Sequence, residues 1–193
     1  MRHPILDSES VGIRDRFHPL AELERRLAAL PAAPADAGRV VLIVRRADGG
    51  RRETPEGIRL GIDTGVPGDK WGKRPARKPD MQLAVMQHDV ADLIANGQPL
   101  PLFGDNLFLD LDLSNQNLPA GSRLRMGSVL LEVTAEPHDG CKKFRARFGA
   151  DALRFVAMPA LRHRNLRGIY MRVIEAGEIA VGDVTEVVAR PQR

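Results

Sequence analysis

Short alternating segments separated by glycine turns run through most of this 193-residue sequence and constrain its fold more than any other feature. The most regular is Leu107–Ser114, in which leucine takes every second position while Asp110 and Asp112 fall between. A two-residue period places the leucines on one face of a half-buried strand. Exposure on the other face explains Asp110 and Asp112 better than paired catalytic carboxylates would. Further strands are predicted at residues 39–45, 57–63, 81–86, 122–126, 129–135, 169–174 and 184–189. Many short strands with few helices favour a mainly β fold, a closed or nearly closed β-barrel.

The remaining segments predict an N-terminal helix and a few short peripheral helices. Residues 1–16 show no period and are expected to form an irregular arm, whereas residues 18–30 place four leucines at the spacing of an amphipathic helix. The Pro- and Ala-rich residues 31–38 end that helix. Helices are also expected at 89–95 and from 141 to about 158, with a break at Gly149. We therefore divide the chain into an N-terminal arm and helix, residues 1–38, and a single globular β-barrel domain, residues 39–193.

Composition narrows the class of protein. With 43% hydrophobic residues the chain can bury one substantial core. One cysteine forms no internal disulfide, and neither a secretory leader nor a span of about 18 apolar residues is present, so we expect a cytoplasmic protein with no membrane segment. An aromatic content of 4% leaves few stacking platforms for single strands, and the net charge of +4 is small, so no nucleic-acid partner is expected.

The single cysteine, Cys141, follows a predicted strand and a turn. Pro137 and Gly140 interrupt strand pairing just before it, which places the sulfur between that strand and a helix beginning at Lys142. The helix N-terminus, two lysines and a possible imidazolium at His138 would all favour the thiolate. A thiolate is both a nucleophile and a soft-metal ligand. The alternative is that Cys141 is a small buried hydrophobe.

Two basic clusters are predicted to form anion sites. Residues 73–79 are interrupted by prolines and must form a loop, and residues 161–168 lead into a strand. Guanidinium forks suit phosphate oxygens, although solvated surface loops would have the same composition. Because loops gather at the rims of a barrel, we predict that both clusters converge on one pocket beside Cys141. The candidate side chains are Arg74, Arg77, Arg162, Arg164 and Arg167.

The order of these signals resembles the MOSC domain, the module shared by molybdenum-cofactor sulfurases, amidoxime-reducing enzymes and small stand-alone bacterial proteins. The resemblance covers roughly residues 57–189 and is carried by the following pieces: Gly65-Val66-Pro67-Gly68-Asp69, Gly104-Asp105-Asn106-Leu107, Pro137-His138-Asp139-Gly140-Cys141-Lys142-Lys143-Phe144, Arg167-Gly168-Ile169-Tyr170-Met171-Arg172-Val173, Gly177 and Gly182-Asp183. It implies an antiparallel β-barrel in which the cysteine binds molybdenum or accepts a sulfur atom, while basic residues hold the phosphate of a molybdopterin-type molybdenum cofactor.

Three functions follow from this resemblance and from the residues. The first is a molybdenum-cofactor protein that reduces N-hydroxylated or N-oxide substrates with the help of a redox protein. The second is a metal-free carrier of a persulfide on Cys141, supplied by a sulfur-donor protein. The third is a non-catalytic anion-binding module. A cysteine hydrolase using His138 lacks an orienting third residue, and one Cys with five scattered His gives no zinc-ligand spacing.

Site roles are assigned accordingly. Cys141 and His138 are the catalytic candidates, and Cys141 is also the metal ligand. The resemblance and the basic clusters together nominate these residues for cofactor binding: Lys70, Arg74, Arg77, Asn106, Lys142, Lys143, Arg162, Arg164 and Arg167.

Overall fold

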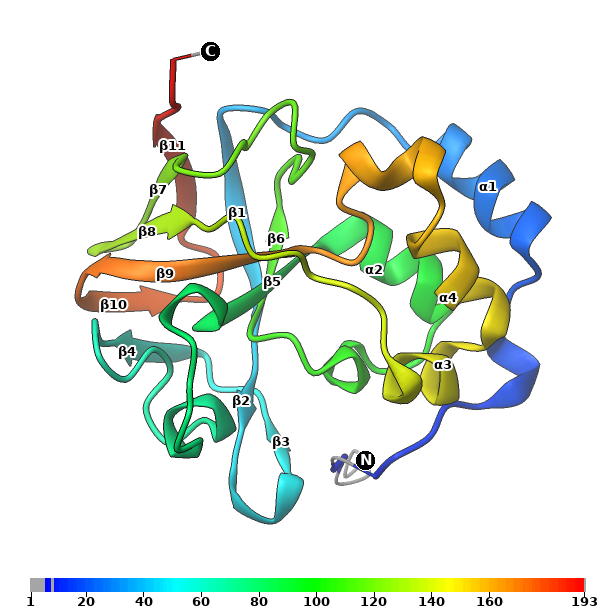
Figure 1. Ribbon diagram of the computed structural model, residues 1–193, viewed down its shortest axis with the longest axis horizontal. Coiled ribbons are helices and arrows are strands. Elements are labelled where there is room, and N and C mark those ends of the chain that lie inside the picture. The colour runs from blue at the N-terminus through cyan, green and yellow to red at the C-terminus, as the bar shows by residue number, and fades with distance from the viewer. Residues whose placement is uncertain (1–5, 8, 193) are drawn as a thin grey trace.

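The computed structural model describes residues 6–7 and 9–192, which form a closed seven-stranded barrel with helices packed against one side (Figure 1). Around the barrel the strand order is β1-β11-β7-β8-β9-β5-β6. The mainly β prediction is confirmed. The barrel strands are β1 (Ala37–Ile43), β5 (Leu83–Gln87), β6 (Leu107–Asp110), β7 (Arg123–Met126), β8 (Val129–Val133), β9 (Ile169–Glu175) and β11 (Val184–Ala189). Two small ribbons pair β2 (Arg45–Arg46) with β3 (Arg52–Glu53) and β4 (Gly57–Leu60) with β10 (Gly177–Ala180).

One strand pair departs from the antiparallel pattern. Strands β5 and β6 run parallel, whereas the other barrel pairs in the described part of the chain are antiparallel. Between them the chain passes through α2 (His88–Ala95) and a 3₁₀ turn (Leu100–Phe103), a crossover that returns it to the same end of the barrel. Helix α2 confirms the helix predicted at 89–95. It ends at Ala95, and the next residue, Asn96, caps it with a left-handed φ of 48°.

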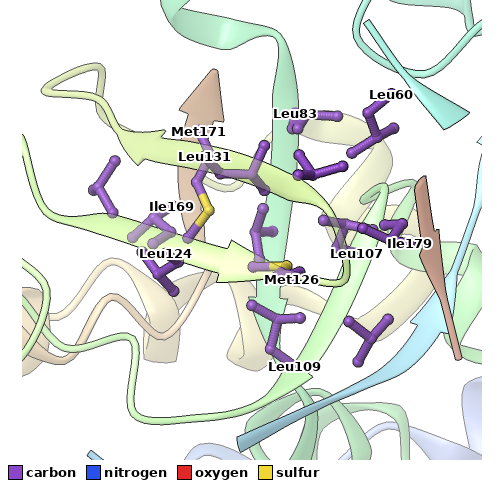
Figure 2. Packing of buried hydrophobic residues seen from close by; sticks show 14 of the residues in the cluster. Leu60, Leu83, Leu107, Leu109, Leu124, Met126, Leu131, Ile169, Met171 and Ile179 are labelled. Carbon is purple, nitrogen blue, oxygen red and sulfur yellow. The ribbon is translucent and has the colours of Figure 1, made fainter. Parts of the chain in front are cut away.

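Side chains that point into the barrel form its apolar core (Figure 2). Leucines from β5, β6, β7 and β8 meet there with Met171 of β9 and Ile179 of β10. Each fully buried side chain of this size stabilises the fold by about 1.5–3 kcal/mol. The inward set alternates with outward residues along β5, β6, β7, β8 and β9, as a two-residue period requires, whereas a bulge interrupts the alternation in β1.

The strand predicted at Leu107–Ser114 is shorter than expected. Strand β6 ends at Asp110, because the Asp112 carboxylate accepts hydrogen bonds from the backbone N–H and the hydroxyl of Ser114 and bends the chain into a turn. The prediction of one buried face is also wrong at Phe108, which points away from the core yet is fully buried. The helical layer covers that side of the strand.

The second apolar cluster lies between the outside of the barrel and the helices α1 (Leu20–Ala29), α2, α3 (Lys142–Phe148) and α4 (Ala150–Val156). Leu23 and Leu27 of α1 are buried in it, as the leucine spacing predicts. The rings of Phe103 and Phe148 stack with centroids 4.1 Å apart. Helices α3 and α4 are separated at Gly149, where the break was predicted. None of the helices in the described ranges combines the length and apolar character needed to cross a membrane.

The N-terminal arm lies along α3. Residues 1–5 and 8 fall outside the described ranges; the rest of the arm is irregular, as expected, except for a 3₁₀ turn at Arg14–Arg16. The Gly12 N–H donates to Ala146 O at 3.1 Å, and Arg147 Nε donates to Ser10 O at 3.2 Å. A Cβ on Gly12 would lie 1.8 Å from Arg147 O, so only glycine permits this close approach.

Candidate functional site

Three arginines converge on the turn that precedes β6. Arg46 Nη1 donates to Gly104 O at 3.2 Å. A Cβ built on Gly104 would lie 3.3 Å from Arg52 Nη2 and 3.6 Å from Arg147 Nη1. Gly104 has a φ of +79°, a left-handed conformation that favours glycine. The turn therefore has both the backbone geometry and the missing side chain that let three guanidiniums gather around it.

Asp69 fixes the first of these arginines. Its carboxylate is 2% exposed and accepts from Arg46 Nη2 at 2.6 Å and from Arg46 Nε at 2.9 Å, with further bonds from Trp71 N and Asn106 Nδ2. Burial alone would raise the pKa of Asp69, but the hydrogen bonds and charge of Arg46 hold it below its ordinary value. Asn106 is fully buried and also bonds Val44 O, so it positions Asp69 and has no exposed surface for a ligand.

Asp105 forms the second buried ionic contact. Its carboxylate is fully buried and accepts from Arg167 Nη1 at 2.8 Å, while its other oxygen lies 3.6 Å from His138 Nε2. The Arg167 guanidinium lies over the Phe144 ring at 5.2 Å, and the His138 ring packs on Tyr170 with centroids 4.3 Å apart. Asp105 thus connects an arginine and a histidine on the outside of the barrel.

His138 is an uncharged imidazole at neutral pH. Burial is the largest cause that lowers the pKa of His138 well below 6.5, and the charges of Arg167 and Arg46 lower it further. The expectation that an imidazolium at His138 favours the Cys141 thiolate is therefore wrong. A proton on this buried histidine would add a positive charge close to those of Arg167 and Arg46, which is unfavourable.

Cys141 is exposed and is the residue immediately before α3, so the predicted position between strand and helix is confirmed. Burial lowers the pKa of Arg147, and the charge of Cys141 is the largest effect that opposes this. The thiol and the Arg147 guanidinium are thus within electrostatic range of each other. Lys143, two residues further on, pairs with Glu9 of the arm at 2.7 Å.

The site has unpaired polar groups and an excess of positive charge. Burial is the first cause that lowers the pKa of Arg52 to about 10, followed by the charges of Arg147 and Arg46. The guanidiniums of Arg46, Arg52, Arg147 and Arg167 outnumber the buried carboxylates of Asp69 and Asp105, and the charges of Glu9 and Cys141 also act on Arg147. Several buried atoms find no hydrogen-bond partner within the described ranges: Arg52 Nε and Nη1, Arg167 Nε, Asp105 Oδ1 and His138 Nδ1. Such an arrangement is suited to an anion with hydrogen-bonding oxygens.

The first predicted basic cluster lies on an exposed loop. Lys70, Arg74 and Arg77 are all exposed. The Arg77 guanidinium lies 5.3 Å from the Trp71 ring centroid and donates to a backbone oxygen of its own loop. Arg74 is within electrostatic range of a site residue: burial raises the pKa of Tyr170, and Arg74 is among the charges that oppose this.

The second predicted cluster divides. Arg167 is buried in the site, and exposed Arg162 lines a pocket together with His138. Arg164 instead lines two grooves against α1. Lys142 is exposed beside Cys141. The sequence-predicted basic residues therefore occupy several surfaces, and Arg167 alone belongs to the buried arginine cluster.

Sequence reasoning missed Arg46, Arg52 and Arg147 as well as the two buried acids. A signal for the acids was present, since Asp69 and Asp105 each follow a glycine in the segments that carry the MOSC resemblance. Arg46 and Arg52 also gave a local signal, because they are paired across the short β2–β3 hairpin around Gly49 and Gly50. Arg147 gave none, since it lies far away in the sequence and only the fold brings it to Gly104.

Comparisons with known proteins agree with this fold. The family model for the MOSC domain matches residues 78–186. Among solved structures, the YUAD protein from Bacillus subtilis superimposes with a TM-score of 0.58 at 18% identity, over 78% of this chain and 95% of that one. YiiM from Escherichia coli gives 0.54 at 21% identity, over 80% of this chain and 72% of that one. A comparison with curated protein sequences finds no match. The matched region contains Cys141, His138, Asp105, Arg147 and Arg167, and the chain belongs to the MOSC domain family.

Proposed function

We propose that the arginine cluster and Cys141 bind a molybdopterin-type molybdenum cofactor, with Cys141 as the sulfur ligand of the metal. The observation that carries this proposal is the set of unpartnered guanidinium N–H groups of Arg52 and Arg167, together with an exposed cysteine at the start of the helix that carries Arg147. The residues fit such a group, because a thiolate suits a soft metal and guanidinium forks suit a phosphate. When bound, the cofactor supplies two-electron redox chemistry, such as reduction of an N-hydroxylated or N-oxide substrate.

The residues of the chain have separate roles in this proposal. Arg52 and Arg147 bind the anionic part of the cofactor, and Asp69 keeps Arg46 oriented beside them. His138 stays neutral, so one ring nitrogen can hold a proton while the other accepts one. Burial of the imidazole against Tyr170 restricts its orientation.

The exposure of Cys141 supports a second candidate, a metal-free persulfide carrier. An exposed thiol can be reached by a sulfur-donor protein, and the positive surroundings would stabilise a persulfide anion. If the protein instead binds the molybdenum cofactor, the same exposure would let a redox protein approach the site. A non-catalytic anion-binding module would need the arginines but not the sulfur.

Metal and pterin analysis of protein purified from a host that makes the cofactor separates these functions. We expect molybdenum and pterin to copurify with the native protein and to be lost in Arg52→Met, while the matched control Arg51→Met retains them, because Arg51 is a mostly exposed neighbour. Native protein without metal but with sulfane sulfur on Cys141 would favour the carrier. Native protein with neither would leave the anion module and overturn the proposal.

A further inference from the structure

A pocket of about 550 Å³ opens beside His138, at the end of the barrel where β8 ends and β9 begins. Its volume is in the range of small-molecule sites. Three segments line it: the loop after β6, the connection from β8 to α3, and the 3₁₀ turn at Pro159–Arg164 with the residues that follow it. None of the arginines around Gly104 lines this pocket.

The pocket has an apolar floor. Leu118, Val133 and Ile169, which are 1%, 3% and 6% exposed, belong to the barrel core and contribute to the lining. Pro137 adds a further apolar surface. Apolar groups over most of the lining with a few polar groups at defined positions are typical of a site for a small organic molecule.

His138 forms one wall and contributes an unpaired acceptor. Its side chain is 6% exposed, and the buried Nδ1 has no hydrogen-bond partner in the described part of the chain. Nε2 faces the Asp105 carboxylate, which favours the tautomer with the proton on Nε2 and the lone pair on Nδ1. Gly168, which also lines the pocket, packs closely on the backbone of Val85 and lies next to that nitrogen: a Cβ there would lie 2.2 Å from Val85 O and 3.3 Å from Nδ1. A ligand with an O–H or N–H group would supply the missing partner.

Arg162 contributes a free cation at the rim. Its side chain is exposed, and no side chain in the described ranges pairs with its guanidinium. The carboxylate of Glu136 faces the same pocket but is paired with Lys78 Nζ at 3.3 Å. The rim therefore has an unpaired positive charge, which suits a carboxylate or a similar anion.

We infer that this pocket is a second binding site, separate from the arginine cluster, for a small organic acid with an apolar body and a hydrogen-bond donor. The body packs on Leu118, Val133 and Ile169, the acid group binds Arg162, and the donor reaches His138 Nδ1. This inference does not depend on whether the protein binds a molybdenum cofactor.

Calorimetric titration with 4-hydroxybenzoate tests the inference, because this probe combines an aromatic body, a hydroxyl donor and a carboxylate. Two matched probes each lack one feature: benzoate lacks the donor, and 4-hydroxybenzamide lacks the charge. We expect each to bind the native protein about 3- to 10-fold more weakly, as the loss of one hydrogen bond or one charged contact implies. Equal binding of all three probes, or none at millimolar concentration, would overturn the inference.

Variants then locate the site. Arg162→Ala should weaken the binding of 4-hydroxybenzoate about 5-fold, so that it binds no more tightly than 4-hydroxybenzamide. Arg164→Ala, on the same turn, and Arg52→Met, in the other site, should leave the binding of 4-hydroxybenzoate unchanged. His138→Phe keeps a ring against Tyr170 and should abolish the preference for 4-hydroxybenzoate over benzoate. If His138→Phe does not fold, the comparison of the three probes on the native protein and on Arg162→Ala still tests whether the pocket binds the organic acid. Equal losses in Arg162→Ala and Arg164→Ala would contradict the assignment.

Discussion

Arg52 should reduce the stability of the ligand-free protein, and its removal should therefore stabilise the chain while weakening anion binding. The guanidinium is part-buried, two of its nitrogens have no partner within the described residues, and Arg147 and Arg46 repel it. Arg52→Met removes the charge and keeps an unbranched aliphatic side chain, so packing around Gly104 is largely retained.

The size of the effect follows from the pKa of Arg52. A change from 12.5 to about 10 corresponds to about 3.4 kcal/mol against the charged form. Because the side chain is only part-buried, solvent reduces both the burial penalty and the repulsion, and we take somewhat less than half of this value, about 1.5 kcal/mol. The residue remains protonated in both the folded and the unfolded chain at neutral pH, so this penalty does not vary with pH around 7.

Urea unfolding at neutral pH in a buffer without multivalent anions measures the free energy of unfolding. We expect the free energy of unfolding of Arg52→Met to exceed that of the native protein by about 1.5 kcal/mol. That of the control Arg51→Met should differ from the native value by less than about 0.5 kcal/mol. Added inorganic phosphate should stabilise the native protein more than Arg52→Met. A destabilised Arg52→Met protein in the anion-free buffer would refute the view that the cluster has an excess of positive charge.

Two further predictions concern the buried charges. Asp69→Asn leaves Arg46 without its counter-charge and should cost about 3 kcal/mol in urea unfolding, and a loss below about 1 kcal/mol would mean that solvent or another group compensates Arg46. Because the pKa of His138 is lowered in the folded protein, the unfolded chain binds the extra proton as pH falls below about 6.5, and stability decreases. His138→Phe should remove up to about 2 kcal/mol of that decrease between about pH 7.5 and 5, while His18, whose pKa is also lowered mainly by burial, contributes to both proteins. Identical pH profiles would show that His138 protonates freely in the fold.

The barrel was predictable because its information is local. Alternation and glycine turns define most strands, and the segment Val184–Ala189 matches β11 at both ends. The strand at Leu107–Ser114 was predicted too long because the period continues through Leu111 and Leu113, which remain buried after the chain has turned. Periodicity reports burial, and a buried turn has the same pattern as a strand.

The candidate site was predictable only in part. Cys141 could be placed because a strand, a turn and a helix start surround it in sequence. The arginine cluster could be predicted only in part, since Arg46 and Arg52 are paired across the β2–β3 hairpin, whereas Arg147 of α3 joins them only through the packing of the helical layer. Runs of basic residues indicated exposed loops instead, where a charge stays solvated and has little desolvation cost.

The central claim is that Cys141 is the sulfur ligand of a bound molybdenum, and X-ray absorption at the molybdenum edge tests it most directly. The samples are native protein and Cys141→Ser, both purified from a host that makes the cofactor. We expect the native spectrum to contain one more sulfur ligand than the variant spectrum, or the variant to lose the metal altogether. In either case the unfolding midpoint of the variant should stay close to that of the native protein, since Cys141 is exposed. Native protein without molybdenum, or the same number of sulfur ligands in both proteins, would contradict it.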